Sequence, residues 1–470
     1  MTPGAARQSM IAGPVTADED IFTADDSVMS EGKNNRCDVL LLGTVVTMDR
    51  DHTIIEDGAV AVCGATIAAV GPASELRQRY QAAETLSLPK ALIMPGLVNA
   101  HTHAAMSCMR GLADDLPLMT WLQEHIFPVE GRLTGEMVYH ASLLSLVEMI
   151  KSGTTSFCDM YLFAGDVARA ADRSGMRAWI GEVLYDFPSP NYGELAAGFA
   201  YVEELAQRYK NHPLVNITMD PHSVYTCAPD LLVALKEKAI AHDCPYVIHL
   251  SETADEVETV RRRYGKTPVN HLEALGLLDE RVIADHCVML SLDEIDLLSR
   301  RQVKVAHCPE SNMKLASGVA PVPELLAAGV TVGLGTDGSA SNNNVDLFAE
   351  MDMAAKLHKV HRLDPTVMTA RETLHMATMG GARLLGAHRQ IGSLEPGKMA
   401  DMIVLDLDQP HLTPMYNIAS HLVYAAKGSD VVHSLINGKV VMRDRQLTAL
   451  DEKQIIARVN EMTRLLTGRG

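Results

Sequence analysis

Short apolar runs alternate with longer amphipathic stretches through most of this 470-residue chain. Helical stretches such as 137–151, 230–242 and 345–358 separate the apolar runs. This alternation predicts parallel strands joined by helices. The eight runs of strand length are 92–99, 154–159, 177–183, 215–221, 246–250, 282–285, 303–306 and 331–336. Eight such units favour an α/β fold of the closed (β/α)8 TIM-like type. An open, doubly wound sheet is the alternative, but no glycine-rich phosphate loop favours it.

Both ends of the chain instead have the pattern of short strands and hairpins. Near the start, 59–62 and 66–70 flank the turn Cys63-Gly64-Ala65, and near the end 431–436 and 439–441 flank Asn437-Gly438. Such turns join antiparallel strands, so we expect one small β-sandwich domain built from both chain ends. The expected plan is a disordered acidic tail (1–35), first sandwich part (36–93), metal-dependent barrel (94–388), second sandwich part (389–447) and C-terminal helix (448–470).

Charge and cysteine content narrow the class of protein. The net charge is −18 and no basic stripe is present, which argues against binding nucleic acid polymers. No apolar run reaches membrane-spanning length, so we expect no membrane partner. The 8 cysteines are scattered singly without a C-x-x-C pair. That spacing is atypical of a disulfide framework and favours a cytoplasmic protein.

Polar side chains that can bind metals follow most of the predicted strands. His101 and His103 end the first strand, and residues two apart on a strand point to the same side. A single His-x-His pair arises easily by chance, so it indicates a metal site only if other strand ends also carry metal-binding residues. They carry Asp220 and His222, His249 and Glu252, Asp285 and His286, His307, and Asp337. In a barrel these carboxyl ends form one rim, where active sites lie.

Three imidazoles and one carboxylate suit a divalent metal and leave room for water. We expect His101, His103, His249 and Asp337 to be the metal ligands, with Zn²⁺ favoured and Fe²⁺ or Mn²⁺ as alternatives. A metal at such a site makes hydroxide available near neutral pH. Glu252 lies three residues past His249 and can shuttle protons in the same cavity, while His286 can orient the water. His307 is expected to shape the floor of the pocket or bond the backbone, and not to bind metal.

The motifs at these strand ends resemble those of the amidohydrolase superfamily, in its branch of mononuclear-metal deaminases and triazine hydrolases. The resemblance covers about residues 37–445 and is greatest to the 5′-methylthioadenosine/S-adenosylhomocysteine deaminases. The stretches that carry it are 95–103, 249–252, 285–287, 307–312 and 335–339, with 116–130 and 220–229 matching the deaminases.

This resemblance implies a zinc-dependent aminohydrolase that converts an adenine nucleoside, a small-molecule substrate, to its inosine analogue and ammonia. Glu252 would protonate N1 of adenine while hydroxide adds to C6, and Asp337 and His286 would handle the proton of the water. Glu130 would bind the ribose hydroxyls, since a carboxylate can accept two hydrogen bonds from a diol. His222 would contact the substrate near the ribose. The resemblance also implies a homo-oligomer.

One departure bears on the substrate. Some relatives use an arginine between the third and fourth strands for the amino-acid end of S-adenosylhomocysteine, but residues 178–207 contain no lysine or arginine. We therefore favour methylthioadenosine over S-adenosylhomocysteine or adenosine. Met106, Met109 and Met119 are candidates for an apolar slot that holds the methylthio group.

Two other functions remain open at this point. The same residues could serve a deaminase or chlorohydrolase of another N-heterocycle, such as guanine, an 8-oxopurine or an s-triazine. A barrel kept as a non-catalytic binding module is the alternative from another class. Single residues could also have a structural role and no functional one. Asp337 could cap a turn, Glu130 could start a helix and His222 could brace a loop.

Overall fold

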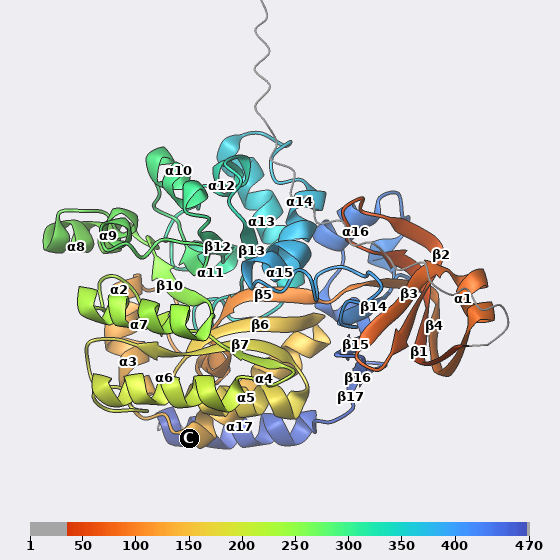
Figure 1. Ribbon diagram of the computed structural model, residues 1–470, viewed down its shortest axis with the longest axis horizontal. Helices are drawn as coiled ribbons and strands as arrows, with labels where there is room; N and C mark the ends of the chain where they lie inside the picture. The colour runs from red at the N-terminus through yellow and green to blue at the C-terminus, as the bar shows by residue number, and fades with distance from the viewer. Residues whose placement is uncertain (1–34, 468–470) are drawn as a thin grey trace, which may run out of the picture.

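The computed structural model describes residues 35–467, and Figure 1 shows a barrel at the centre and left with a smaller β domain at the right. The acidic tail expected at 1–35 lies outside the described residues, except for Asn35. Eight segments of the barrel wall run parallel in sequence order: β5 (Leu97–Thr102), β6 (Thr154–Tyr161), β7 (Arg177–Leu184), β8 (Val215–Ile217), β10 (Tyr246–Leu250), β11 (Val282–His286), β12 (Lys304–His307) and β13 (Val332–Leu334).

Backbone hydrogen bonds close this wall at both of its seams. The strands form two arcs, β5 to β8 and β10 to β13. Val247 N donates to Met219 O (3.1 Å) at one seam, and Thr336 N donates to His101 O (3.0 Å) at the other. The predicted (β/α)8 barrel is therefore confirmed.

Two strands begin or end differently from the prediction. The apolar run 92–99 was expected to be a single strand, but β4 (Tyr80–Pro95) ends in the β domain and β5 starts at Leu97. The chain crosses between the two parts at Gly96, where a Cβ would lie 2.0 Å from Thr155 Oγ1, so any larger residue would collide with β6. The expected strand 215–221 is interrupted, because only Asp220–Pro221 (β9) continues it, paired with β7.

Helices surround the barrel (Figure 1). Local sequence fixes several of their first turns. In the capping box of α10, Ser291 Oγ accepts from Glu294 N (3.3 Å) and the Glu294 carboxylate accepts from Ser291 N (2.8 Å). The helices of this part are α2 (Leu118–Thr120), α3 (Phe127–Glu130), α4 (Gly135–Lys151), α5 (Ala164–Ser174), α6 (Leu195–Tyr209), α7 (Pro229–His242), α8 (Ala254–Tyr264), α9 (Pro268–Ala274), α10 (Leu292–Arg300), α11 (Pro309–Lys314), α12 (Val322–Ala327), α13 (Leu347–Arg362), α14 (Ala370–His375), α15 (Gly381–Leu384), α16 (Ile418–Tyr424) and α17 (Glu452–Thr467).

The β domain is one sheet that both chain ends build together, in the order β17-β16-β15-β14-β4-β1-β2-β3. Its edge at β3 bonds to the segment before β14, since Ile67 N donates to Lys398 O (2.8 Å), so the sheet curls around an apolar cluster. Besides β4, its elements are β1 (Asn35–Val46), β2 (Ile54–Cys63), β3 (Thr66–Pro72), α1 (Ala73–Arg79), β14 (Met402–Asp406), β15 (Val431–Ile436), β16 (Lys439–Arg443) and β17 (Gln446–Leu447).

A buried ion pair joins the β domain to the barrel. Arg177 on β7 donates from Nε to Asp401 Oδ2 at 2.6 Å, and both side chains are almost fully buried. Asp401 O also accepts from Gly96 N (3.1 Å) at the crossing described above. Within residues 35–467, no helix is long and apolar enough to cross a membrane.

Candidate metal centre and active site

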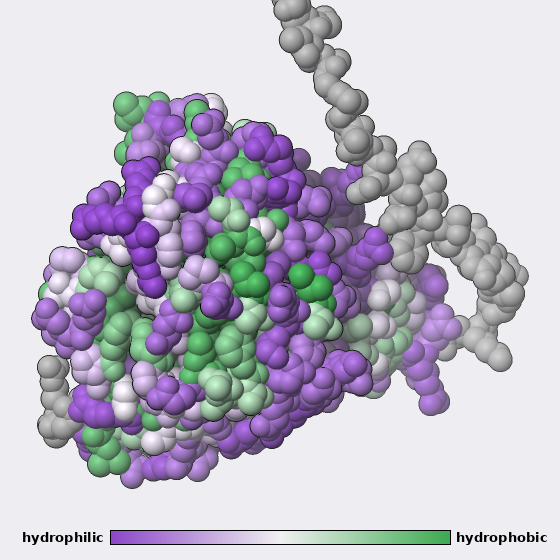
Figure 2. All heavy atoms as spheres, turned by 60° about the vertical axis from the view of Figure 1, so that its left-hand side comes forward, coloured by the Kyte–Doolittle hydropathy of each residue, from purple (hydrophilic) through white to green (hydrophobic). Residues whose placement is uncertain are grey.

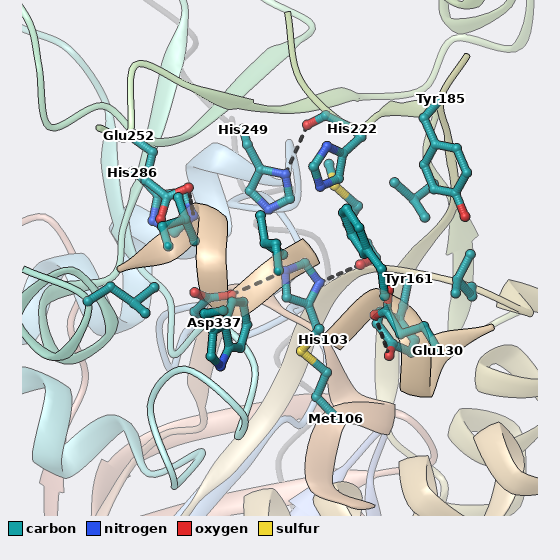
Figure 3. A pocket seen from close by; sticks show the side chains of 18 of the residues that line it. His103, Met106, Glu130, Tyr161, Tyr185, His222, His249, Glu252, His286 and Asp337 are labelled. Atoms are coloured by element: carbon teal, nitrogen blue, oxygen red, sulfur yellow. Dashed lines mark hydrogen bonds and ion pairs between the residues drawn. The ribbon is translucent and has the colours of Figure 1, made fainter. Parts of the chain in front are cut away.

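The predicted site residues come together at the carboxyl ends of the barrel strands. This end of the molecule carries a patch of apolar surface bordered by hydrophilic residues (Figure 2). Beneath it lies a concave cavity, the usual form of a small-molecule site. Seven of the eight predicted residues line it: His103, Glu130, His222, His249, Glu252, His286 and Asp337 (Figure 3). His101 is fully buried on β5, next to the cavity wall.

Three of the histidines form a tight group. The ring centroid of His101 lies 4.8 Å from that of His103 and 5.0 Å from that of His249. Asp337 follows β13 and joins them, with its Oδ1 3.1 Å from His103 Nε2 and 3.6 Å from His101 Nε2. The four expected ligands thus come from three strands far apart in the sequence and converge on one small volume.

Hydrogen bonds at the other ring nitrogens orient these imidazoles. His249 Nδ1 lies 2.9 Å from the backbone oxygen of His222, and His103 Nδ1 contacts Met160 O. Because a carbonyl oxygen can only accept, each Nδ1 carries the proton and each Nε2 keeps its lone pair free. His101 Nδ1 lies 3.1 Å from Asp285 Oδ2, which favours the same arrangement.

This arrangement fits a metal ion. His101 Nε2 is buried and has no hydrogen-bond partner within residues 35–467. Buried polar atoms are nearly always satisfied, and a divalent cation is the partner that three converging imidazole nitrogens and a carboxylate suit. The ligand atoms of His101, His103 and Asp337 lie within 4.8 Å of one another, and so do those of His101, His249 and His286. His286 is therefore close enough to take part in binding as well.

The electrostatics of the cluster also favour a cation. Burial lowers the pKa of His101, but the carboxylates of Asp285 and Asp337 outweigh it and raise that pKa to about 10. Burial alone would raise the pKa of Asp337, whereas the neighbouring imidazoles of His101 and His103 bring it well below its usual value. Asp337 is consequently an ionised carboxylate among the imidazoles.

Glu252 and His286 face each other beside this cluster. His286 Nε2 lies 4.0 Å from Glu252 Oε2. Burial raises the pKa of Glu252, so its carboxyl holds a proton more readily than an exposed one. Ser251 adopts a left-handed backbone (φ 53°) that turns Glu252 toward the cavity. Glu256 supports this turn, since its carboxylate accepts from Ser251 N (3.0 Å) and Glu252 N (2.7 Å).

The opposite part of the cavity combines one carboxylate with apolar walls. Glu130 ends α3 and its Oε1 accepts from the Tyr161 hydroxyl (2.8 Å). His222 follows β9, and its Nδ1 lies 2.9 Å from Thr226 Oγ1. None of the described residues that line the cavity is a lysine or an arginine. The apolar lining is Met106, Leu118, Trp121, Leu122, Phe127, Met160, Leu162, Val183 and Leu315, with Tyr185 and Tyr225 beside it.

Some expectations about neighbouring residues were wrong. Of the three methionines proposed for an apolar slot, Met106 lines the cavity, whereas Met109 and Met119 do not. His307 does not form the floor of the pocket. It is fully buried at the end of β12 and does not line the cavity, and its Nε2 lies 3.1 Å from the Nε2 of His358 on α13.

Other residues that support the site were not predicted from the sequence. Tyr161, which bonds Glu130, could have been noticed as a hydroxyl at the end of a predicted strand. Glu256, Ser311, Asn312 and Ser341 offered no comparable signal, because nothing in their spacing shows which strand end they would meet.

Comparison with known proteins agrees with this geometry. The sequence model of the Amidohydrolase family matches residues 92–441. The chain is 54% identical over 434 residues (92% of this chain, 99% of the relative) to a protein of Syntrophobacter fumaroxidans named 5-methylthioadenosine/S-adenosylhomocysteine deaminase. It is 51% identical over 427 residues (90% and 96%) to a protein of Syntrophus aciditrophicus named 5-methylthioadenosine/S-adenosylhomocysteine deaminase 1.

Solved structures give the same picture. An adenosine deaminase from Xanthomonas campestris with bound zinc superposes with a TM-score of 0.91 at 40% identity, covering 93% of this chain and 100% of that one. An atrazine chlorohydrolase from Arthrobacter aurescens complexed with zinc superposes with a TM-score of 0.84 at 25% identity, covering 90% and 100%.

Proposed function

Because this chain belongs to the amidohydrolase family, we propose that it catalyses the metal-dependent hydrolytic deamination of an adenine nucleoside. The products are the inosine analogue and ammonia. The observation that carries the proposal is the convergence of His101, His103, His249 and Asp337 beside the buried carboxyl of Glu252. A carboxylate at the far end of the same cavity, Glu130, supports a substrate that has a ribose.

The residues proposed to hold one metal ion per subunit are His101, His103 and His249 through Nε2, and Asp337 through Oδ1. Zinc is favoured, as it is the metal bound in the Xanthomonas and Arthrobacter neighbours, with Fe²⁺ and Mn²⁺ as alternatives. When bound, such an ion lowers the pKa of water so that hydroxide is available near neutral pH.

The side chains around the cavity then move the protons. Glu252 donates its proton to N1 of adenine as hydroxide adds to C6, which gives a tetrahedral carbon. Asp337 and His286 hold the proton that the water gives up. The 6-amino group takes the proton held by Asp337 and His286 and leaves as ammonia. The C6 hydroxyl gives its proton to Glu252 as the carbonyl forms, so atoms and charge balance. The raised pKa of Glu252 suits a group that gives a proton in one step and regains it later.

The cavity lining supports methylthioadenosine as the preferred substrate. Glu130 accepts hydrogen bonds from the ribose hydroxyls, and His222 contacts the substrate near the ribose. The apolar side chains of Trp121, Leu122 and Phe127 suit a methylthio group. A zwitterionic amino-acid tail would meet no cationic side chain among the described lining residues, which disfavours S-adenosylhomocysteine.

We also propose a cellular setting and an assembly for the enzyme. The 8 cysteines are all free, which suits the reducing cytoplasm. A homo-oligomer stays a prediction from the family resemblance. We also retain the division into a barrel at 94–388 flanked by two sandwich parts as a proposal.

A substrate panel tests the function. Purified protein is given methylthioadenosine, S-adenosylhomocysteine, adenosine, guanine and a chlorotriazine, each with and without a chelator, and ammonia or chloride release is measured. We expect ammonia from the adenine nucleosides, with the highest kcat/KM for methylthioadenosine. Turnover of guanine or the triazine alone would contradict the proposal, and a higher kcat/KM for S-adenosylhomocysteine would overturn the substrate preference alone.

A further inference from the structure

A short helix, α11, stands between the two groups that are proposed to handle the proton of the water. It follows β12, whose neighbours in the sheet are β11 and β13. His286 ends β11, and Asp337 lies just beyond β13. Two neighbouring residues of α11, Ser311 and Asn312, are buried at 0% and 1% exposure. Neighbouring helical residues point about 100° apart, so one helix can reach both strand ends.

Ser311 selects the oxygen of Asp337 that faces the histidines. Its hydroxyl donates to Asp337 Oδ2 at 2.6 Å, and the Ser341 hydroxyl donates to the same oxygen at 2.8 Å. With Oδ2 occupied by two hydroxyls, Oδ1 is the oxygen that lies 3.1 Å from His103 Nε2. Outer hydrogen bonds of this kind fix the orientation of a carboxylate ligand.

Asn312 selects the protonated nitrogen of His286. Its Oδ1 lies 2.9 Å from His286 Nδ1. An amide oxygen can only accept, so Nδ1 carries the hydrogen and Nε2 offers its lone pair toward Glu252 and the cavity. His286 is 1% exposed, so no bulk water competes for its Nδ1.

The helix itself is anchored. Pro309 begins it, and the Glu310 backbone N donates to the carboxylate of Glu350 on α13 (3.2 Å). Glu350 is fully buried and also accepts from Asn342 Nδ2 (2.5 Å). That same amide bonds Thr336 O (2.7 Å), immediately before Asp337. The helix and the end of β13 are therefore tied to one buried carboxyl group.

We propose that Ser311 and Asn312 are positioning residues that set which atom of Asp337 and of His286 faces the reaction. Ser311 presents Oδ1 of Asp337 to the metal, and Asn312 holds His286 in the tautomer whose Nε2 accepts a proton. The kinetic part of this proposal rests on the proposed deaminase function, whereas the metal-binding part does not.

Zinc affinity tests the role of Ser311. The dissociation constant is measured by competition with a chromophoric chelator for the parent, Ser311→Ala and Ser339→Ala. Ser339 is a matched control, because it is equally buried and its hydroxyl has no partner among the described residues. We expect Ser311→Ala to bind zinc about 10- to 100-fold more weakly, as for other groups that orient metal ligands. Ser339→Ala should match the parent, and equal affinity in the two variants would overturn the role of Ser311.

Steady-state kinetics with methylthioadenosine test Asn312. Asn312→Leu should lower kcat about 10- to 100-fold and leave KM within about threefold, since the tautomer matters to the chemistry and not to binding. Asn312→Asp keeps an acceptor at the same place and should stay within about fivefold of the parent kcat. If Asn312 instead donates to His286, Asn312→Asp will be as impaired as Asn312→Leu, and the proposal fails.

The zinc affinities and the kinetics together distinguish failure of the proposed deaminase function from failure of the proposed positioning roles. A parent enzyme that deaminates no adenine nucleoside would refute the function, while the zinc affinities would still decide the role of Ser311. Should Asn312→Leu fail to fold, as judged by its melting temperature, Asn312→Asp still decides between an accepting and a donating amide.

Discussion

Replacing Glu252 with glutamine removes the proposed proton shuttle and little else. Glutamine has nearly the same volume and keeps one acceptor oxygen, and Glu256 bonds only the backbone of this turn. A positioned acid–base group contributes about 10²- to 10⁴-fold to a rate, which corresponds to about 2.7–5.4 kcal/mol in the barrier. Glu252 is only 8% exposed, so bulk water cannot easily replace it. We therefore expect kcat to fall at least about 10²-fold.

The assay combines ultraviolet-monitored turnover of methylthioadenosine with metal analysis of the same samples. Glu252→Gln should keep the parent metal content and a KM within about threefold, because the shuttle is needed for chemistry and not for binding. Glu258→Gln serves as the control, since this side chain is 51% exposed, pairs with Arg262 on the surface of α8, and should leave kcat unchanged. A fall of less than tenfold in Glu252→Gln would refute the shuttle role.

Three further predictions follow from other parts of the site and the fold. His249→Ala removes the Nε2 atom that binds the metal and should lose both metal and turnover. A variant that keeps stoichiometric metal and full activity would disprove the role of His249 as a ligand. Glu130→Gln removes the charge that accepts the ribose hydroxyls. It should lower kcat/KM for methylthioadenosine about 10- to 100-fold, mainly through KM, yet leave 2′,3′-dideoxyadenosine unaffected; equal losses for both substrates would count against ribose binding. Burial raises the pKa of Glu182 to about 8, so its contribution to stability is complete below its unfolded pKa of about 4.3 and is lost as pH rises through 8. The melting temperature should thus fall less between about pH 6 and pH 9 in Glu182→Gln than in the parent, and identical slopes would show that this carboxyl is not involved.

Much of the barrel and of the candidate site could be predicted because both depend on local pattern. Apolar runs mark strands, and residues that can bind metals directly follow them. Because the carboxyl ends of parallel barrel strands lie at one rim, His101, His249 and Asp337 could be grouped from the sequence. The prediction of one unbroken strand at 92–99 was wrong, because the apolar run continues across Gly96 although the strand does not. The steric demand of Thr155 on that glycine exists only in the folded barrel.

The supporting hydrogen bonds could not be predicted for the same reason. Ser311 meets Asp337 across 26 residues of sequence, and Tyr161 meets Glu130 across 31. Whether a serine or an asparagine points into a site or away from it depends on the exact rotation of its helix. His307 illustrates the opposite error, since it ends a strand as His286 does but does not line the cavity and lies beside His358.

Removal and return of the metal test the central claim most directly. The protein is stripped with a chelator, analysed for metal, assayed for ammonia release from methylthioadenosine, and then titrated with Zn²⁺. The account predicts no turnover without metal and full recovery at one equivalent per chain. Sustained deamination by metal-free protein, or by a variant lacking both His101 and His103, would contradict it.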